Sequence, residues 1–387
     1  MRCTQIVLVP RTLGPIAGGL RRYANLAVIA LLAACSYTEP FVDRAGHALP
    51  MSAASMETVR LNGVDQSVWF RGRDARAPAL ILLHGGPGAS ESALFRHFDS
   101  ALENSFLVVY WEQRGTGRSY HGSIPDSSMT IDQMLDDLDA LIDTVHARFG
   151  QQRVVLLAHS WGTILGTLYA YRHPEKVAAY VGVAQITDFA AGERLSYRWA
   201  LHEAERRGDR HALEELRDMA PAPKSVDDEL ALGRIVEDYG GSLCGGLSTG
   251  KLIWTALRTD EADLADLFRF GKGNAFSLHA LRPEYSHVDL TRLRHFDVPI
   301  VFMLGRHDWH TPSVLAARYF DQIDAPSKRI EWFEHSAHNP PFAEPNAFVR
   351  AVVRDVLPLV ADDSSDAVLR DRPPPASVRE RTVEPGA

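Results

Sequence analysis

The sequence predicts an α/β protein built on a mostly parallel sheet with helices on both faces. Short apolar, β-branched runs recur along the chain, and most of the later runs alternate with amphipathic helical segments. Between them, residues 189–288 form charged, helix-favouring segments without clear strand signals, which predicts a helical insertion between two late strands. The chain has 387 residues, 45% of them apolar, and is therefore long enough to bury a substantial core.

The expected elements follow from hydrophobic periodicity. Strand signals fall at 59–61 and 67–71, around an Asn-Gly hairpin signal, and then at 80–83, 107–111, 154–157, 179–183, 300–304 and 330–333. The clearest helix covers 131–149, with its apolar residues on one face. Thr130 and Gln133 predict a capping box at its start, and Gly150 predicts its end.

The composition of the chain divides it into five parts. We expect a signal peptide at 1–34, a small-residue tether at 35–55, a core made of 56–188 and 289–361, the helical cap at 189–288, and a polar, proline-rich disordered tail at 362–387.

The N-terminal segment predicts export. Arg21 and Arg22 precede an apolar run that is too short to span a bilayer, as in a secretory signal. The following "LAAC" resembles a bacterial lipobox, so we expect Cys35 to be acylated and the protein to be an extracytoplasmic, membrane-attached lipoprotein. A plain cleaved signal, an uncleaved anchor and a misassigned start codon remain alternatives. After processing, only Cys244 would be left, so no internal disulfide is expected.

The charge of the chain argues against nucleic acid as a partner. The formal net charge is -8, and it becomes about -12 if the first 34 residues, which carry four arginines and no acid, are removed. We expect a small-molecule or peptide substrate instead.

Ser160 is the candidate nucleophile. It lies in "AHSWG", directly after the apolar run 154–157 and before a helical segment, which is the strand–turn–helix context of the G-x-S-x-G nucleophile elbow. The turn is tight, so the positions two before and two after the serine must be small. Ala158 departs from the usual glycine but is still small.

A serine hydroxyl needs a base, and the base needs an acid that fixes its tautomer. Asp308 follows one late strand, and His335 and His338 follow the next, at the sheet edge where α/β active sites assemble. We assign Asp308 as the acid and prefer His338 over His335 as the base, because His338 lies deeper in the loop. His159, His307 and His310 are expected to be structural or rim residues. No metal-binding spacing is present, so neither a metal nor another cofactor is expected.

The segment "HGGPG", 84–88, predicts half of an oxyanion hole. It follows an apolar strand, and its glycines let the backbone approach a substrate closely. We assign the backbone N–H groups of Gly86 and Trp161 as the two donors. A plain glycine turn is the alternative for this segment taken alone.

Five ordered motifs together resemble the proline iminopeptidase branch of the α/β-hydrolase superfamily over about residues 59–360: "HGGPG", "VVYWEQRGTGRSY", "AHSWGT", "LGRHD" and "SAHNPPF". The resemblance implies an α/β-hydrolase fold and cleavage of a residue, often proline, from a free peptide N-terminus. It also implies that acidic side chains of the cap hold the amine. Glu193, Glu203 and Glu205 are the candidates, although acids on a cap helix are more often a solvated face.

The leading hypothesis is a serine hydrolase that cleaves small peptides or aminoacyl amides through an acyl-enzyme. A carboxylesterase on small esters uses the same triad and stays open, as does acyl transfer to an acceptor other than water. A non-catalytic, surface-tethered binding protein is the alternative of another class. An epoxide hydrolase or dehalogenase would need an aspartate where Ser160 stands.

Overall fold

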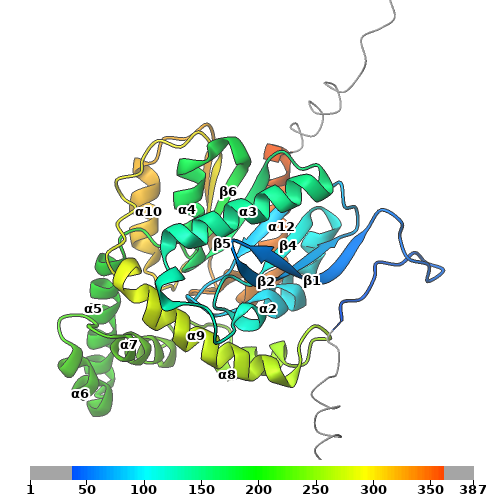
Figure 1. Cartoon of the computed structure of the whole chain (residues 1–387). Coiled ribbons are helices and arrows are strands. Elements are labelled where there is room, and N and C mark those ends of the chain that lie inside the picture. Colours follow the sequence, from blue (N-terminus) through cyan, green and yellow to red (C-terminus); the bar gives the residue numbers. More distant parts are fainter. Residues whose placement is uncertain (1–36, 361–387) are drawn as a thin grey trace, which may run out of the picture.

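A computed structural model describes residues 37–360 of the chain (Figure 1). The predicted signal peptide, the lipidation site at Cys35 and the tail at 362–387 lie outside the described residues. No helix in the described part is both long enough and apolar enough to cross a membrane.

The centre of the molecule is one sheet, as predicted. Its eight strands are β1 (Ala53–Leu61), β2 (Val64–Gly72), β3 (Ala79–Leu83), β4 (Leu107–Trp111), β5 (Val154–His159), β6 (Val177–Val183), β7 (Ile300–Gly305) and β8 (Lys328–Phe333). They are arranged in the order β1-β2-β4-β3-β5-β6-β7-β8. β2 pairs antiparallel with β1 and β4, and every other pair is parallel. The carboxyl ends of β3, β5, β7 and β8 therefore meet at one edge.

Helices cover both faces of the sheet. One face packs against α3 (Ile131–Phe149), α4 (Gly162–Arg172) and α10 (Ser313–Gln322), and the other packs against α2 (Ser92–Asp99) and α12 (Pro345–Asp355) (Figure 1). The short α11 (Pro340–Ala343) follows β8. Two apolar cores result, one on each side of the sheet, and the inner strands β3 to β7 are buried along their whole length.

The inserted segment between β6 and β7 is helical. It contains α5 (Phe189–Arg207), α6 (Arg210–Met219), α7 (Val226–Asp238), α8 (Thr249–Ala256) and α9 (Leu264–Tyr285). A bridge between Asp188 and Asp289 joins the two ends of the insertion. Residues of α5, α6 and α7 bury a small core of their own, and these three helices project from one side of the molecule (Figure 1).

Two local features differ from the expectation. Residues 37–55 do not form a free tether, because β1 begins at Ala53 and the buried Arg71 donates hydrogen bonds to Thr38 Oγ1 and to the carbonyl of Glu39. At the start of α3, Thr130 Oγ1 accepts the amide of Gln133 at 3.0 Å, but the Gln133 side chain bonds Asp137 instead of returning to Thr130. The first half of the predicted capping box is thus present without the second.

Candidate active site

Ser160 lies on the corner between β5 and α4. Its φ of +51° falls in the left-handed region that residues other than glycine seldom adopt. The corner is held by the Ser160 amide, which donates to Val183 O at 3.0 Å, and by Thr163, whose amide and hydroxyl both donate to Ser160 O. The turn therefore places the serine side chain at the carboxyl edge of the sheet, as a nucleophile elbow requires.

The tightness of this corner makes a testable prediction at Gly162. A Cβ at position 162 would lie 2.1 Å from the carbonyl oxygen of Leu83, which is fixed in β3. Gly162→Ala should therefore lower the free energy of unfolding by about 3 kcal/mol. Gly122→Ala is the matched control, because a Cβ there would meet nothing within 4 Å. Thermal unfolding of both variants checks the prediction, and an unchanged melting temperature for Gly162→Ala would contradict this packing.

Asp308 and His338 face each other across the ends of β7 and β8. Asp308 Oδ2 lies 3.0 Å from His338 Nδ1, and Asp308 Oδ1 accepts the amides of His310 and Thr311 at 2.9 Å. Asp308 is 3% exposed, so its carboxylate is held by these donors rather than by water. An acceptor facing Nδ1 keeps the proton on that nitrogen and leaves Nε2 free to act as a base.

The other histidines are placed differently. His335, the alternative base, is exposed, and the exposed His307 bonds the carbonyl of Glu334. The His310 ring is tilted against the His338 ring, with 4.6 Å between the ring centroids, and it lines the cavity over Ser160. Desolvation in the cavity and the neighbouring His338 lower the pKa of His310, which favours its neutral form. His159 is buried behind His338.

Gly86 and Trp161, the predicted oxyanion donors, both line the cavity that contains Ser160. Within residues 37–360, neither backbone amide has a hydrogen-bond acceptor. Gly86 has a φ of +120°, and a Cβ there would lie 2.5 Å from the amide nitrogen of Gly88, so only glycine fits. The Trp161 indole donates to Gln113 Oε1 at 2.9 Å, which fixes the residue that follows the serine.

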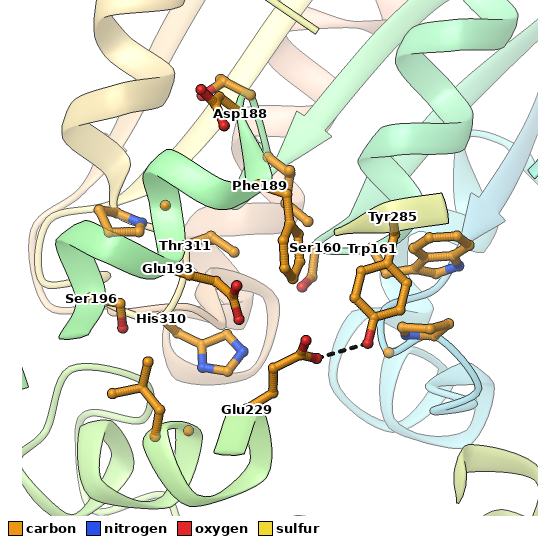
Figure 2. A pocket seen from close by; sticks show the side chains of 18 of the residues that line it. Ser160, Trp161, Asp188, Phe189, Glu193, Ser196, Glu229, Tyr285, His310 and Thr311 are labelled. Carbon is orange, nitrogen blue, oxygen red and sulfur yellow. Dashed lines mark hydrogen bonds between the residues drawn. The ribbon is translucent and has the colours of Figure 1, made fainter. Parts of the chain in front are cut away.

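The cavity over Ser160 has a volume of about 220 Å³ and extends from the sheet edge into the cap. One of the three predicted cap acids lies at this cavity, and the other two do not. Glu193 of α5 lines the cavity, whereas Glu203 pairs with Arg206 and Arg207 outside it and Glu205 is exposed. The sequence analysis missed Glu229 of α7, which also lines the cavity. Figure 2 shows the carboxylates of Glu193 and Glu229 pointing into the space near Ser160.

These two carboxylates have different surroundings. Glu229 accepts hydrogen bonds from Arg282 Nε at 2.6 Å and from the Tyr285 hydroxyl at 2.7 Å, although burial still raises its pKa above the usual range. Glu193 has neither a hydrogen bond nor an ion pair among the described residues. Burial, and then the negative charge of Glu229, raise the pKa of Glu193 to about 8. A cation bound beside Glu193 would lower this pKa and favour the ionised carboxylate.

Comparisons with known proteins give a consistent result. Residues 78–345 match the family described as the alpha/beta hydrolase fold. The chain is 30% identical over 314 residues to a probable aminopeptidase, YbaC, of Bacillus subtilis, covering 78% of this chain and 96% of the relative. It is 25% identical to a proline iminopeptidase of Neisseria gonorrhoeae, covering 78% of this chain and 95% of that protein. The crystal structure of a proline iminopeptidase from Mycobacterium smegmatis superposes with a TM-score of 0.57 at 19% identity, covering 81% of this chain and all of the other.

Proposed function

The chain belongs to the α/β-hydrolase family, in its proline iminopeptidase-like branch, and is a hydrolase, and we propose that it is a serine aminopeptidase. Its substrates are small peptides or aminoacyl amides. One observation carries the proposal. Two partly buried carboxylates, those of Glu193 and Glu229, line the same cavity as Ser160. A cavity of about 220 Å³ suits one small residue, and its acidic end favours a cationic group over a neutral acyl chain.

The α-ammonium group of the substrate binds between the two cap carboxylates. Glu229 is already oriented by Arg282 and Tyr285, so it presents a fixed acceptor. Glu193 has no competing cation in direct contact and pairs with the ammonium group when it is ionised. A free amine held at this end of the cavity positions the first peptide carbonyl of the substrate at Ser160, which explains a preference for N-terminal residues.

The chemistry then follows from the residues at the sheet edge. Ser160 Oγ attacks the carbonyl carbon while His338 Nε2 takes its proton, and Asp308 holds the imidazole in the required tautomer. The amides of Gly86 and Trp161 donate to the oxyanion of the tetrahedral intermediate. His338 returns the proton to the departing amine. Water, deprotonated by the same histidine, releases the acyl group from Ser160 and regenerates the enzyme.

Substrate class is the direct test of this proposal. We expect the protein to hydrolyse prolyl- and alanyl-naphthylamides with a higher kcat/KM than p-nitrophenyl butyrate. The same triad would cleave both substrate types, but only the naphthylamides carry the free amine that the cap acids recognise. Cleavage of the ester without cleavage of either naphthylamide would contradict an aminopeptidase and assign a carboxylesterase.

The pKa of Glu193 predicts how activity depends on pH. Because that pKa is raised to about 8, the carboxylate that pairs with the substrate amine is formed only as the pH rises through this value. The substrate α-amino group loses its proton over about the same range, at pH ~7.7–8.0. We therefore expect kcat/KM for an aminoacyl-naphthylamide to be bell-shaped, with a maximum near pH 8.

Glu193→Gln serves as the control for this profile. The variant should lose the part that Glu193 contributes to the rise of kcat/KM on the acidic side of the profile, called the acid limb. The pH profile of kcat/KM for p-nitrophenyl butyrate should be the same in both proteins. An acid limb that is identical in the variant and the wild type would contradict this role of Glu193.

A further inference from the structure

The buried ring of His159 lies between two hydrogen-bond acceptors. Its Nδ1 is 2.9 and 3.0 Å from the two carboxylate oxygens of Glu91, and its Nε2 is 3.0 Å from the backbone carbonyl of His338. The residue is 1% exposed, and the rings of Phe95 and Phe342 approach it edge-on. Water therefore has little access to the ring.

The two acceptors decide the number of protons that the pair holds. A carbonyl oxygen only accepts, so Nε2 must carry a proton to bond His338 O. The contact between Nδ1 and Glu91 then needs a second proton, since a bare ring nitrogen facing a carboxylate is repelled. The amide of Gly85 donates to Glu91 Oε2 at 2.8 Å, which favours the ionised carboxylate and leaves the second proton on the ring.

The charges around the ring agree with this arrangement. Burial alone would lower the pKa of His159, but the facing Glu91 carboxylate outweighs it and raises that pKa above the ordinary value. Burial likewise opposes ionisation of Glu91, and His159 nonetheless lowers the Glu91 pKa. The other titratable groups that face the pair are His84, Asp308, His310 and His338. Burial lowers the pKa of His84 and His310, so neither adds a second positive charge.

The pair contacts two segments of the active site, the one that contains Gly86 and the one that contains His338. Glu91 holds Gly85, the neighbour of the oxyanion donor Gly86, while His159 holds the main chain of His338. His159 also directly precedes Ser160 in the sequence. The pair thus contacts both the loop 84–88, called here the oxyanion loop, and the loop that carries His338, and its histidine adjoins the nucleophile elbow.

We propose that His159 and Glu91 form a buried imidazolium–carboxylate pair that positions the oxyanion loop and the base His338 relative to Ser160. The proposal rests on the proposed function, because it assigns the pair a role in the same serine chemistry. Both are positioning residues, since neither lines the cavity over Ser160. If the pair lost its proton, either the contact to Glu91 or the contact to His338 O would break.

The first measurement is the ¹⁵N NMR spectrum of the His159 ring in the full chain. We expect both ring nitrogens to carry protons at pH 8, where an ordinary histidine with a pKa of about 6.5 is neutral. Glu91→Gln keeps a donor and an acceptor at position 91 but removes the charge, so the ring should become neutral in that variant. A neutral His159 in the wild-type protein at pH 8 would overturn the pair.

The second measurement is the rate at which a fluorophosphonate probe labels Ser160. His159→Phe removes both contacts of the ring, and Glu91→Ala releases Gly85 while His159 stays in place; each should lower the rate by about ten- to a hundredfold. Glu91→Gln keeps both contacts and should stay within about threefold of wild type. Glu103→Gln, in the buried ion pair with Arg71, has no contact with Glu91 or His159; it controls for general destabilisation and should label normally.

The outcomes separate this inference from the proposed function. Labelling of His159→Phe or Glu91→Ala within twofold of wild type, at equal folded fraction, would overturn the positioning role. If His159→Phe fails to fold, Glu91→Ala decides. A wild-type protein that does not react at Ser160 would instead overturn the proposed serine mechanism and the positioning role with it, and the ring spectrum would still decide whether the pair is charged.

Discussion

Ser160→Ala should lower kcat for aminoacyl-naphthylamides by about 10⁴-fold or more, with little change in KM. The reason is that Ser160 is the one described serine of the cavity that lies on a left-handed corner, beside the unpaired backbone amides of Gly86 and Trp161. Removing the hydroxyl leaves the oxyanion donors and the binding cavity in place. Substrate binding therefore survives while the covalent step is lost.

The melting temperature is the control for Ser160→Ala, because the substitution removes one oxygen from a side chain that makes no hydrogen bond among the described residues. We expect it to stay within a few degrees of wild type. Residual turnover above about 1% of wild type, in a preparation free of wild-type protein, would mean that Ser160 is not the nucleophile.

At pH 8, where a substantial fraction of Glu193 is ionised, Glu193→Gln and Glu229→Gln should each lower kcat/KM for a substrate with a free amine by about 10²-fold. Each variant removes one carboxylate from a partly buried recognition site, where the loss lies toward the lower end of the about 2–5 kcal/mol that truncating one partner of a buried charge pair costs. The loss should lie mainly in KM, since the carboxylates hold the ammonium group and do not contact the scissile carbonyl. Hydrolysis of p-nitrophenyl butyrate should change by less than about threefold.

Glu203→Gln is the matched control, because Glu203 lies on the same helix as Glu193 but outside the cavity, paired with Arg206. Its kcat/KM should equal that of wild type for both substrates. Equal losses for the amine and the ester substrates in Glu193→Gln would contradict amine recognition and indicate a general distortion of the cavity instead.

The architecture of the chain was predictable because its signals are local. The alternation of apolar strands with amphipathic helices indicates a parallel sheet, and every predicted strand is present in the structure. The order of the motifs also places Ser160, Asp308 and His338 at strand ends on one edge, and the structure brings Asp308 and His338 within 3.0 Å.

The cap acids were harder to predict. Glu229 follows two aspartates in the first turn of α7, where acids are common because they favour the helix N-terminus, so the sequence offers no reason to single it out. Glu203 is ten residues from Glu193, which is about 15 Å farther along the helix axis. Only the packing of α5 and α7 over the sheet distinguishes these residues.

The contacts of His159 could not be predicted from the sequence either. The sequence analysis expected a structural or rim residue, since nothing local connects it with Glu91, which is 68 positions earlier, or with the carbonyl of His338. The tertiary contacts supply both acceptors. The proton on the ring follows from those contacts and not from the residue type.

The most direct test of the central claim compares prolyl-naphthylamide with N-acetylprolyl-naphthylamide on the same wild-type preparation. The two substrates present the same scissile bond, and the acetylated one lacks the charged amine and carries an acetyl group in its place, so their ratio of kcat/KM reports whether the site prefers a free N-terminal amine. The account predicts that the free amine is preferred by about 10²-fold or more. Equal rates for the two substrates, or a preference for the acetylated one, would contradict it.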